Sequence, residues 1–110
     1  MNVSLSARAL GDLDRIYAYI FTHRGQDAAE AFLARARRAT EFVAENPLSG
    51  PHPNWAARHK SLRFWPISGT RFLIFYIANE SAISIERVLD GRRDVVALLE
   101  QGAEESFEDE

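Results

Sequence analysis

The residues of this chain best suited to chemistry are arginines near the end of a strand-like run, in the stretch IERVLDGRRD, residues 85–94. A guanidinium fork matches phosphate and carboxylate oxygens, so such a group could bind an anion. Arg92 and Arg93 follow a glycine and are predicted to project from a corner. Arg87 alternates with apolar residues, so its stem is predicted to be buried and its head to reach Asp94 or a loop carbonyl. The alternative is a salt-bridged turn that only reverses the chain.

The other combinations of reactive residue types are weaker. His52 and His59 lie in one loop without a carboxylate at a ligand spacing, so neither a metal site nor a cofactor is predicted. No strained turn frames a serine, so a Ser-His-Asp hydrolase is not indicated. Asp12 and Asp14 are interpreted as charges in the first turn of a helix, where they complement the helix dipole.

The elements that must position these residues begin with a short strand at 2–5 and a pair of helices. Ser6 is the expected N-cap of the first helix, whose apolar stripe comprises Ala9, Leu13, Ile16 and Ile20. Gly25 should end this helix in a left-handed conformation, and Asp27-x-x-Glu30 should open the next as a capping box. The second helix should stop before Pro47 and bury Phe32, Ala36, Ala39 and Val43. The short connection predicts an antiparallel helical hairpin.

The second half of the chain changes to strand periodicity. After a proline-rich loop, apolar or alternating runs predict a meander of strands at 61–66, 71–78 and 82–89, then a short helix. The run at 71–78 is apolar on both faces, so this strand should be central and covered on each side. Ile83, Ile85, Arg87 and Leu89 are expected on one face of the last strand. The predicted fold class is α+β, a small, mostly antiparallel sheet covered by the hairpin, with the first strand at an edge or parallel within it.

Composition limits the class of protein. The 110 residues suffice for one domain, predicted over 1–102, followed by an acidic segment at 103–110 with five acids and no base. That segment is expected to be disordered and dispensable for folding. Without it the net charge changes from −3 to +2, so the folded part can present a basic face to an acidic or nucleic-acid partner. With no cysteine, no signal sequence and no membrane-spanning run, a cytoplasmic location is expected.

Several motifs occur together in a characteristic order. They are Asp12-Leu13-x-x-Ile16-x-x-Tyr19-Ile20, Asn46-Pro47-x-x-Gly50, Leu62-Arg63, Arg71 with Tyr76, and Arg87-Val88-Leu89 before Gly91-Arg92-Arg93-Asp94. In this order they resemble the ParE/RelE family of bacterial toxins from type II toxin–antitoxin pairs, over about residues 3–99. No single motif is specific, but the ordered set is. The resemblance implies the fold described above and an antitoxin as partner.

The family divides by chemistry, and the resemblance covers both branches. One branch resembles ribosome-dependent mRNA endonucleases, which use cations and acid–base groups instead of a metal. The places of that branch's cations and tyrosine are held here by His59, Ser61, Arg71, Arg93 and Leu99. Two of these positions still hold a cation, Arg71 and Arg93, but the position of the tyrosine, which would supply the aromatic acid–base group, holds Leu99. The ParE-like branch, which inhibits DNA gyrase and blocks replication without being a catalyst, is therefore preferred. A nuclease that uses Arg71, Arg93 and His59 is the alternative.

The resemblance also implies a set of partners. The expected ones are a cognate, ParD-like antitoxin in a hetero-oligomer, DNA gyrase as target, and operator DNA only through the antitoxin, with no membrane. An amphipathic antitoxin segment is expected on an exposed apolar sheet face, unless the loop and final helix cover it. The residues expected to bind the antitoxin are Arg63, Trp65, Arg71, Phe72, Ile74 and Tyr76, and those expected to bind the target are Arg87, Arg92 and Arg93. A third possibility is an inactive toxin fold that binds only antitoxin and operator.

Overall fold

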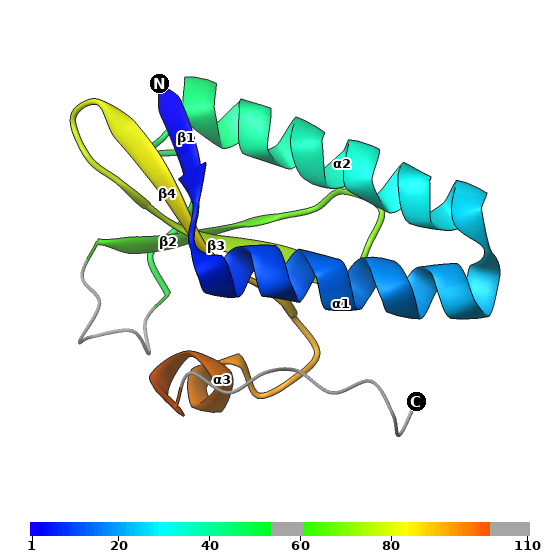
Figure 1. The fold of residues 1–110 in the computed structure, drawn as a ribbon. Coiled ribbons are helices and arrows are strands. Elements are labelled where there is room, and N and C mark those ends of the chain that lie inside the picture. Colours follow the sequence, from blue (N-terminus) through cyan, green and yellow to red (C-terminus); the bar gives the residue numbers. More distant parts are fainter. Residues whose placement is uncertain (54–60, 102–110) are drawn as a thin grey trace.

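The structure is a computed structural model that describes residues 1–53 and 61–101. Its elements are β1 (Asn2–Leu5), α1 (Ala7–Arg24), α2 (Gln26–Glu45), β2 (Leu62–Pro66), β3 (Phe72–Ala78), β4 (Ala82–Asp90) and α3 (Val95–Gln101). Figure 1 shows α1 and α2 antiparallel on one side of the sheet and α3 apart from them. The predicted α+β class and order of elements are confirmed. The predictions for His59 and for the segment 103–110 fall outside the described residues.

The two helices begin and end largely where their capping residues predict. The Ser6 hydroxyl accepts a hydrogen bond from the backbone N–H of Ala9 at 3.0 Å, which confirms Ser6 as the N-cap of α1. Gly25 joins the helices with φ at 90°, a conformation that favours glycine. The predicted capping box is wrong, because Gly25 itself caps α2 without a side-chain hydrogen bond. Glu30 instead accepts a hydrogen bond from the Tyr17 hydroxyl at 3.1 Å.

The sheet has four strands in the order β1-β4-β3-β2. β1 lies at the edge and runs parallel to β4, and the other pairs are antiparallel, as expected. The register between β3 and β4 shifts between Phe75 and Tyr76 and skips Glu86. Such a bulge reverses the alternation of side chains beyond it. The expected common face of Ile83, Ile85, Arg87 and Leu89 is therefore wrong: Val88 joins the two isoleucines in the core, and Leu89 packs in a second cluster.

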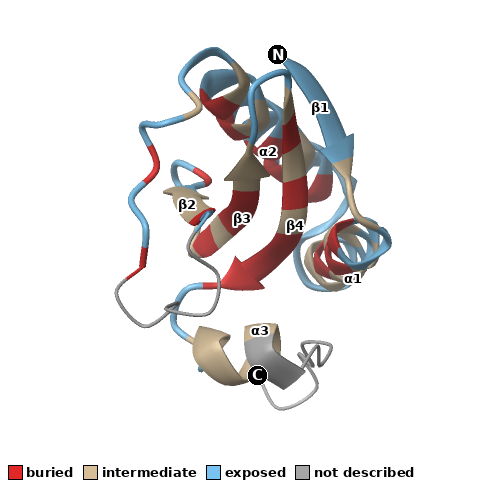
Figure 2. Ribbon diagram, turned by 90° about the vertical axis from the view of Figure 1, so that its left-hand side faces the viewer, coloured by how far each residue is buried: buried red, intermediate tan, exposed pale blue. Residues whose placement is uncertain are grey.

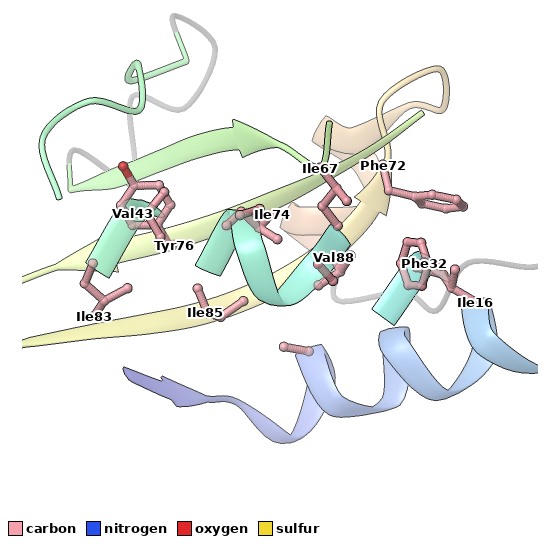
Figure 3. Packing of buried hydrophobic residues seen from close by; sticks show 13 residues of the cluster. Ile16, Phe32, Val43, Ile67, Phe72, Ile74, Tyr76, Ile83, Ile85 and Val88 are labelled. Carbon is pink, nitrogen blue, oxygen red and sulfur yellow. The ribbon is translucent and has the colours of Figure 1, made fainter. Parts of the chain in front are cut away.

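The main core lies between the helical hairpin and the sheet (Figure 3). The strands contribute Phe72, Ile74, Tyr76, Ile83, Ile85 and Val88, and the helices contribute Ala9, Ile16, Phe32, Ala36, Ala39 and Val43. The rings of Phe32 and Phe72 meet edge to face, with their centroids 5.5 Å apart. Phe72, Ile74 and Tyr76 are at most 4% exposed. The prediction that these three residues line an exposed sheet face is wrong, because they pack against the helices.

A second, smaller cluster covers the opposite face of the sheet. Leu62, Phe75 and Leu89 are buried there, and the side chains that pack against them from α3 are Val95, Leu98 and Leu99. Figure 2 shows α3 beneath the largely buried β3 and β4. The central strand is therefore covered on both faces, as its continuous apolar run predicts, and the final helix supplies the second cover. In the part of the chain that the structure describes, no helix has the length and apolarity to cross a bilayer.

Candidate functional site: an arginine corner around Asp90

The end of β4 and the turn after it place three arginines around one buried carboxylate. Asp90, the last residue of β4, is 0% exposed. Its Oδ2 atom lies 2.8 Å from Nε of Arg71, 3.3 Å from Nη2 of Arg92 and 4.0 Å from Nε of Arg93. Its Oδ1 atom accepts a hydrogen bond from the backbone N–H of Arg92 at 2.9 Å. We call Arg71, Asp90, Arg92 and Arg93 the arginine corner.

The charges of the arginine corner decide what it can bind. Burial raises the pKa of Asp90, but hydrogen bonds from Arg92 and the charges of Arg71 and Arg92 outweigh this effect, so the pKa lies below its ordinary value. Asp90 is thus ionised at neutral pH and offsets one of the three positive charges. The side chains of Arg92 and Arg93 are 63% and 33% exposed. The corner therefore holds guanidinium groups at the surface, where they suit phosphate or carboxylate oxygens.

Arg87 does not belong to the arginine corner. It is 4% exposed, and its guanidinium forms a fork on Asp12, with Nε to Oδ2 at 2.8 Å and Nη2 to Oδ1 at 3.0 Å. Its Nη1 donates to the backbone carbonyl of Leu98 at 3.2 Å. The predicted burial is confirmed, but the partner acid is Asp12 and not Asp94, and the carbonyl belongs to helix α3 and not to a loop. A side chain this deeply buried is unsuited to the target-binding role predicted for Arg87, because it would have to leave its ion pair.

Asp12 is the important residue that the sequence interpretation missed. It was interpreted as a charge in the first turn of a helix, but the first turn of α1 holds no acid, and Asp12 is 2% exposed. Besides its fork with Arg87, it accepts hydrogen bonds from the backbone N–H of Val88 at 3.0 Å and from Nη2 of Arg15 at 2.8 Å. The sequence carries a signal for this burial, since Asp12 falls three residues after Ala9 and four before Ile16, on the inward face of α1.

The Asn46-Pro47-x-x-Gly50 motif is held in place by Tyr76 and Arg63, two residues predicted to bind the antitoxin. The Tyr76 hydroxyl accepts from the backbone N–H of Gly50 at 3.0 Å and donates to the carbonyl of Pro47 at 2.9 Å. Nη1 of Arg63 donates to the Gly50 carbonyl at 2.7 Å. A Cβ atom on Gly50 would overlap the Tyr76 hydroxyl, which explains the glycine. Both side chains thus stabilise the loop of the free chain.

The remaining predicted antitoxin contacts, Arg71 and Trp65, lie in different places. Arg71 belongs to the arginine corner, and its guanidinium carbon lies over the rings of Tyr19 and Phe72, 5.9 and 5.1 Å from their centroids. Trp65 is partly buried at the edge of the main core. Its ring stacks on that of Phe42, which is 38% exposed, with centroids 4.6 Å apart. Exposed apolar surface therefore lies beside Trp65 and not along the inner face of β3.

The two cations that match positions of the nuclease branch are brought together by the structure. Arg71 and Arg93 both face the buried carboxylate of the arginine corner. Leu99, at the place of the nuclease tyrosine, packs into the cluster under α3, and Ser61 is exposed. Within residues 1–53 and 61–101, no group of three His, Cys, Asp or Glu side chains could hold a metal ion. The described residues thus supply positive charge without the aromatic acid–base group of that branch.

A strand, a helical hairpin and a meander form the fold that is expected for the class of small toxin domain that the ordered motifs resemble. A family model described as "ParE toxin of type II toxin-antitoxin system, parDE" matches residues 3–95. The chain therefore belongs to the ParE toxin family of type II toxin–antitoxin systems.

A solved structure supports the same fold. It is described as the chromosomal ParDE TA system from P. aeruginosa, and it superposes with a TM-score of 0.68 at 18% sequence identity. The match covers 80% of this chain and 92% of the other. A sequence search of curated proteins gives no significant match. At this level of identity the structural likeness concerns the fold alone.

Proposed function

We propose that this chain inhibits DNA gyrase and so blocks replication, and that it acts by binding and not by catalysis. The observation that carries the proposal is the arginine corner, in which Asp90 holds Arg92 and Arg93 at the surface. A guanidinium remains protonated in proteins, so it can bind an anion but is a poor general base. The position of the nuclease tyrosine holds a packed leucine, Leu99. Membership of the ParE family favours gyrase as the target.

The second candidate function is a ribosome-dependent mRNA endonuclease. It is favoured by the convergence of Arg71 and Arg93 on one carboxylate, since two cations could stabilise the extra charge of a phosphate in the transition state. His59 would have to act as the base in this function. The third candidate is a toxin fold that is inactive and binds only its antitoxin and, through it, operator DNA.

Expression of the chain without an antitoxin separates the three functions. Growth arrest with SOS induction, while translation continues, supports gyrase inhibition. Rapid loss of translation, with mRNA cut at ribosomal A sites, supports the endonuclease. Undisturbed growth, at a protein level confirmed by immunoblot, supports the inactive fold.

We also propose that a cognate, ParD-like antitoxin neutralises this toxin in a cytoplasmic hetero-oligomer. The exposed apolar residues Phe42 and Leu48 lie beside Trp65 and Arg63: Phe42 stacks on Trp65, and Arg63 donates to the Leu48 carbonyl at 3.2 Å. We call these four residues the antitoxin patch. Leu48 is 71% exposed, so an amphipathic antitoxin segment could bury it, with an antitoxin acid near Arg63.

A pair of matched variants tests the antitoxin patch. Leu48→Asp should weaken antitoxin binding at least about tenfold, because it places a charge where an apolar contact is expected. Leu10→Asp on α1 is the control, since Leu10 is 52% exposed and lies outside the patch. The measurement is titration of each folded variant with purified antitoxin. Equal antitoxin affinities for the two variants would show that the antitoxin does not bind at the antitoxin patch.

A further inference from the structure

A cavity of about 540 Å³ lies between the adjoining ends of α1 and α2 and the turn that links β2 to β3. Its polar side chains are mostly basic: His23, Arg24, Arg35 and Arg71. No acidic residue lines it within the part of the chain that the structure describes. The cavity is distinct from the antitoxin patch and shares only Arg71 with the arginine corner. Its charge indicates an anionic ligand.

Three of the cavity's basic side chains, His23, Arg35 and Arg71, are held by contacts within the chain. Arg35 donates from Nη1 to the carbonyl of Ser68 at 3.1 Å and crosses Gly69, where a Cβ atom would overlap the guanidinium. Nδ1 of His23 lies 2.9 Å from the Tyr19 carbonyl oxygen, and the His23 ring lies against that of Tyr19 at a tilt of 31°, with centroids 4.2 Å apart. Asp90 fixes Arg71. A ligand would therefore bind without the entropic cost of ordering these side chains.

The rest of the cavity lining is mostly apolar, with Thr70 and Tyr19 as further polar residues. Phe32 and Phe72 form part of its wall and are 3% and 4% exposed, and Ala28 and Ala31 line it from α2. A bare inorganic anion would satisfy the arginines but leave the accessible part of this wall, at Ala28 and Ala31, in contact with water. A volume of this size, with an apolar wall and a few polar groups, is typical of sites for small organic ligands.

We propose that this cavity binds a nucleoside phosphate. The phosphate would lie between Arg24 and Arg35, whose guanidinium forks suit its oxygens, and the base would lie against the apolar wall. The site is separate from the proposed action on gyrase, so its test uses the chain alone. It is a binding site, and no bond is made or broken in it.

Calorimetric titration of the full chain with three probes tests the ligand class. Adenosine monophosphate should bind at least about tenfold more tightly than either adenosine or inorganic phosphate, because only it engages both halves of the cavity. Its affinity should fall as salt concentration rises. No heat of binding with millimolar adenosine monophosphate would overturn the proposal. Equal affinities for adenosine monophosphate and inorganic phosphate would also overturn it, because the apolar wall would then contribute nothing to binding.

Variants of the cavity separate specific binding from general charge attraction. Arg24→Gln and Arg35→Gln should each weaken adenosine monophosphate binding about tenfold, the effect of losing one charge-assisted hydrogen bond. Ala31→Trp should abolish binding by filling the cavity without changing its charge, so it tests the site even where an arginine variant is unstable. Arg38→Gln, on the same helix but outside the cavity, is the control. Equal weakening by the control, or unchanged binding by Ala31→Trp, would overturn the proposal.

Discussion

Asp12 and Arg87 form a buried, bidentate ion pair although they lie 75 residues apart in the chain. The pair joins α1 to β4, and Arg87 extends the link to α3 through the Leu98 carbonyl. The helices α1 and α3, which pack on opposite faces of the sheet, are thus both linked to β4 through one guanidinium. Removal of Asp12 would leave the Arg87 guanidinium buried without its carboxylate, whereas Asp12 without Arg87 would keep only its contact with Arg15 at 2.8 Å as an ion pair.

The first prediction concerns the stability that this pair provides. Asp12→Ala should lower the free energy of unfolding by about 3–5 kcal/mol, the usual cost of breaking a buried ion pair. The double variant Asp12→Leu with Arg87→Met should recover a substantial part of the loss, because apolar side chains can replace a buried pair. Urea unfolding followed by circular dichroism measures both. Asp14→Ala, on the exposed face of α1, is the control, and an equal loss there would contradict the account.

The second prediction concerns acid stability and Asp90. The pKa of Asp90 in the folded chain lies below its ordinary value of 3.8. Its ionised form therefore contributes stability that is fully present above the ordinary value and is lost as pH falls through the lower folded value. The free energy of unfolding of the parent chain should thus fall below about pH 4 more steeply than that of Asp90→Asn. Urea unfolding between about pH 2 and pH 6 measures the two curves. Parallel curves would show that the arginines do not stabilise the carboxylate.

The third prediction concerns the loop that Tyr76 holds. Tyr76→Phe removes the hydroxyl that accepts from Gly50 and donates to Pro47. The buried N–H of Gly50 would lose its partner, so the free energy of unfolding should fall by about 1–3 kcal/mol. Tyr17→Phe removes an exposed hydrogen bond to Glu30 and should change the same quantity by less than about 0.5 kcal/mol. Urea unfolding measures both variants. Similar losses of unfolding free energy would show that the hydrogen bonds of the Tyr76 hydroxyl to Gly50 and Pro47 do not stabilise the fold.

The fourth prediction concerns Arg92 and Arg93. Replacing both with alanine should cost less than about 1 kcal/mol of stability, because both are partly exposed and Arg71 still pairs with Asp90. Antitoxin affinity should be unchanged, while growth arrest on expression should be lost. Thermal melting, antitoxin titration and growth curves measure the three properties. The control is Arg37→Ala with Arg38→Ala on the exposed side of α2. Full toxicity without Arg92 and Arg93 would reduce the corner to a structural turn.

The periodicity of apolar residues predicts most of the helices and strands. It does not predict which side chains of β3 face the helices. Phe72, Ile74 and Tyr76 are as apolar as Leu73, Phe75 and Ile77, so alternation alone cannot say which set meets the helices. The bulge at Glu86 is equally hidden, because no glycine or proline marks it. It moves Val88 into the core and separates Leu89 from the isoleucines of the same strand.

The site was predictable only in part. The sequence placed Arg92 and Arg93 together because they are neighbours, and it placed Arg87 in a buried position because of its apolar surroundings. It could not pair Arg71 with Asp90, since that contact depends on how β3 and β4 align. The capping role of Ser6 is local and was predicted, whereas the ion pair of Asp12 is distant and was not. Neighbouring residues thus predict the cap at Ser6, although not the one at Asp27, whereas long-range pairs depend on the packed structure.

A supercoiling assay with purified DNA gyrase, relaxed plasmid and the purified chain tests the proposed inhibition of gyrase directly. We expect the chain to abolish supercoiling, and cleaved plasmid to accumulate when the reaction is stopped with detergent and protease. A folded Arg92→Ala and Arg93→Ala double variant should leave supercoiling intact. Undiminished supercoiling at a large excess of a chain that still arrests growth in cells would contradict the claim.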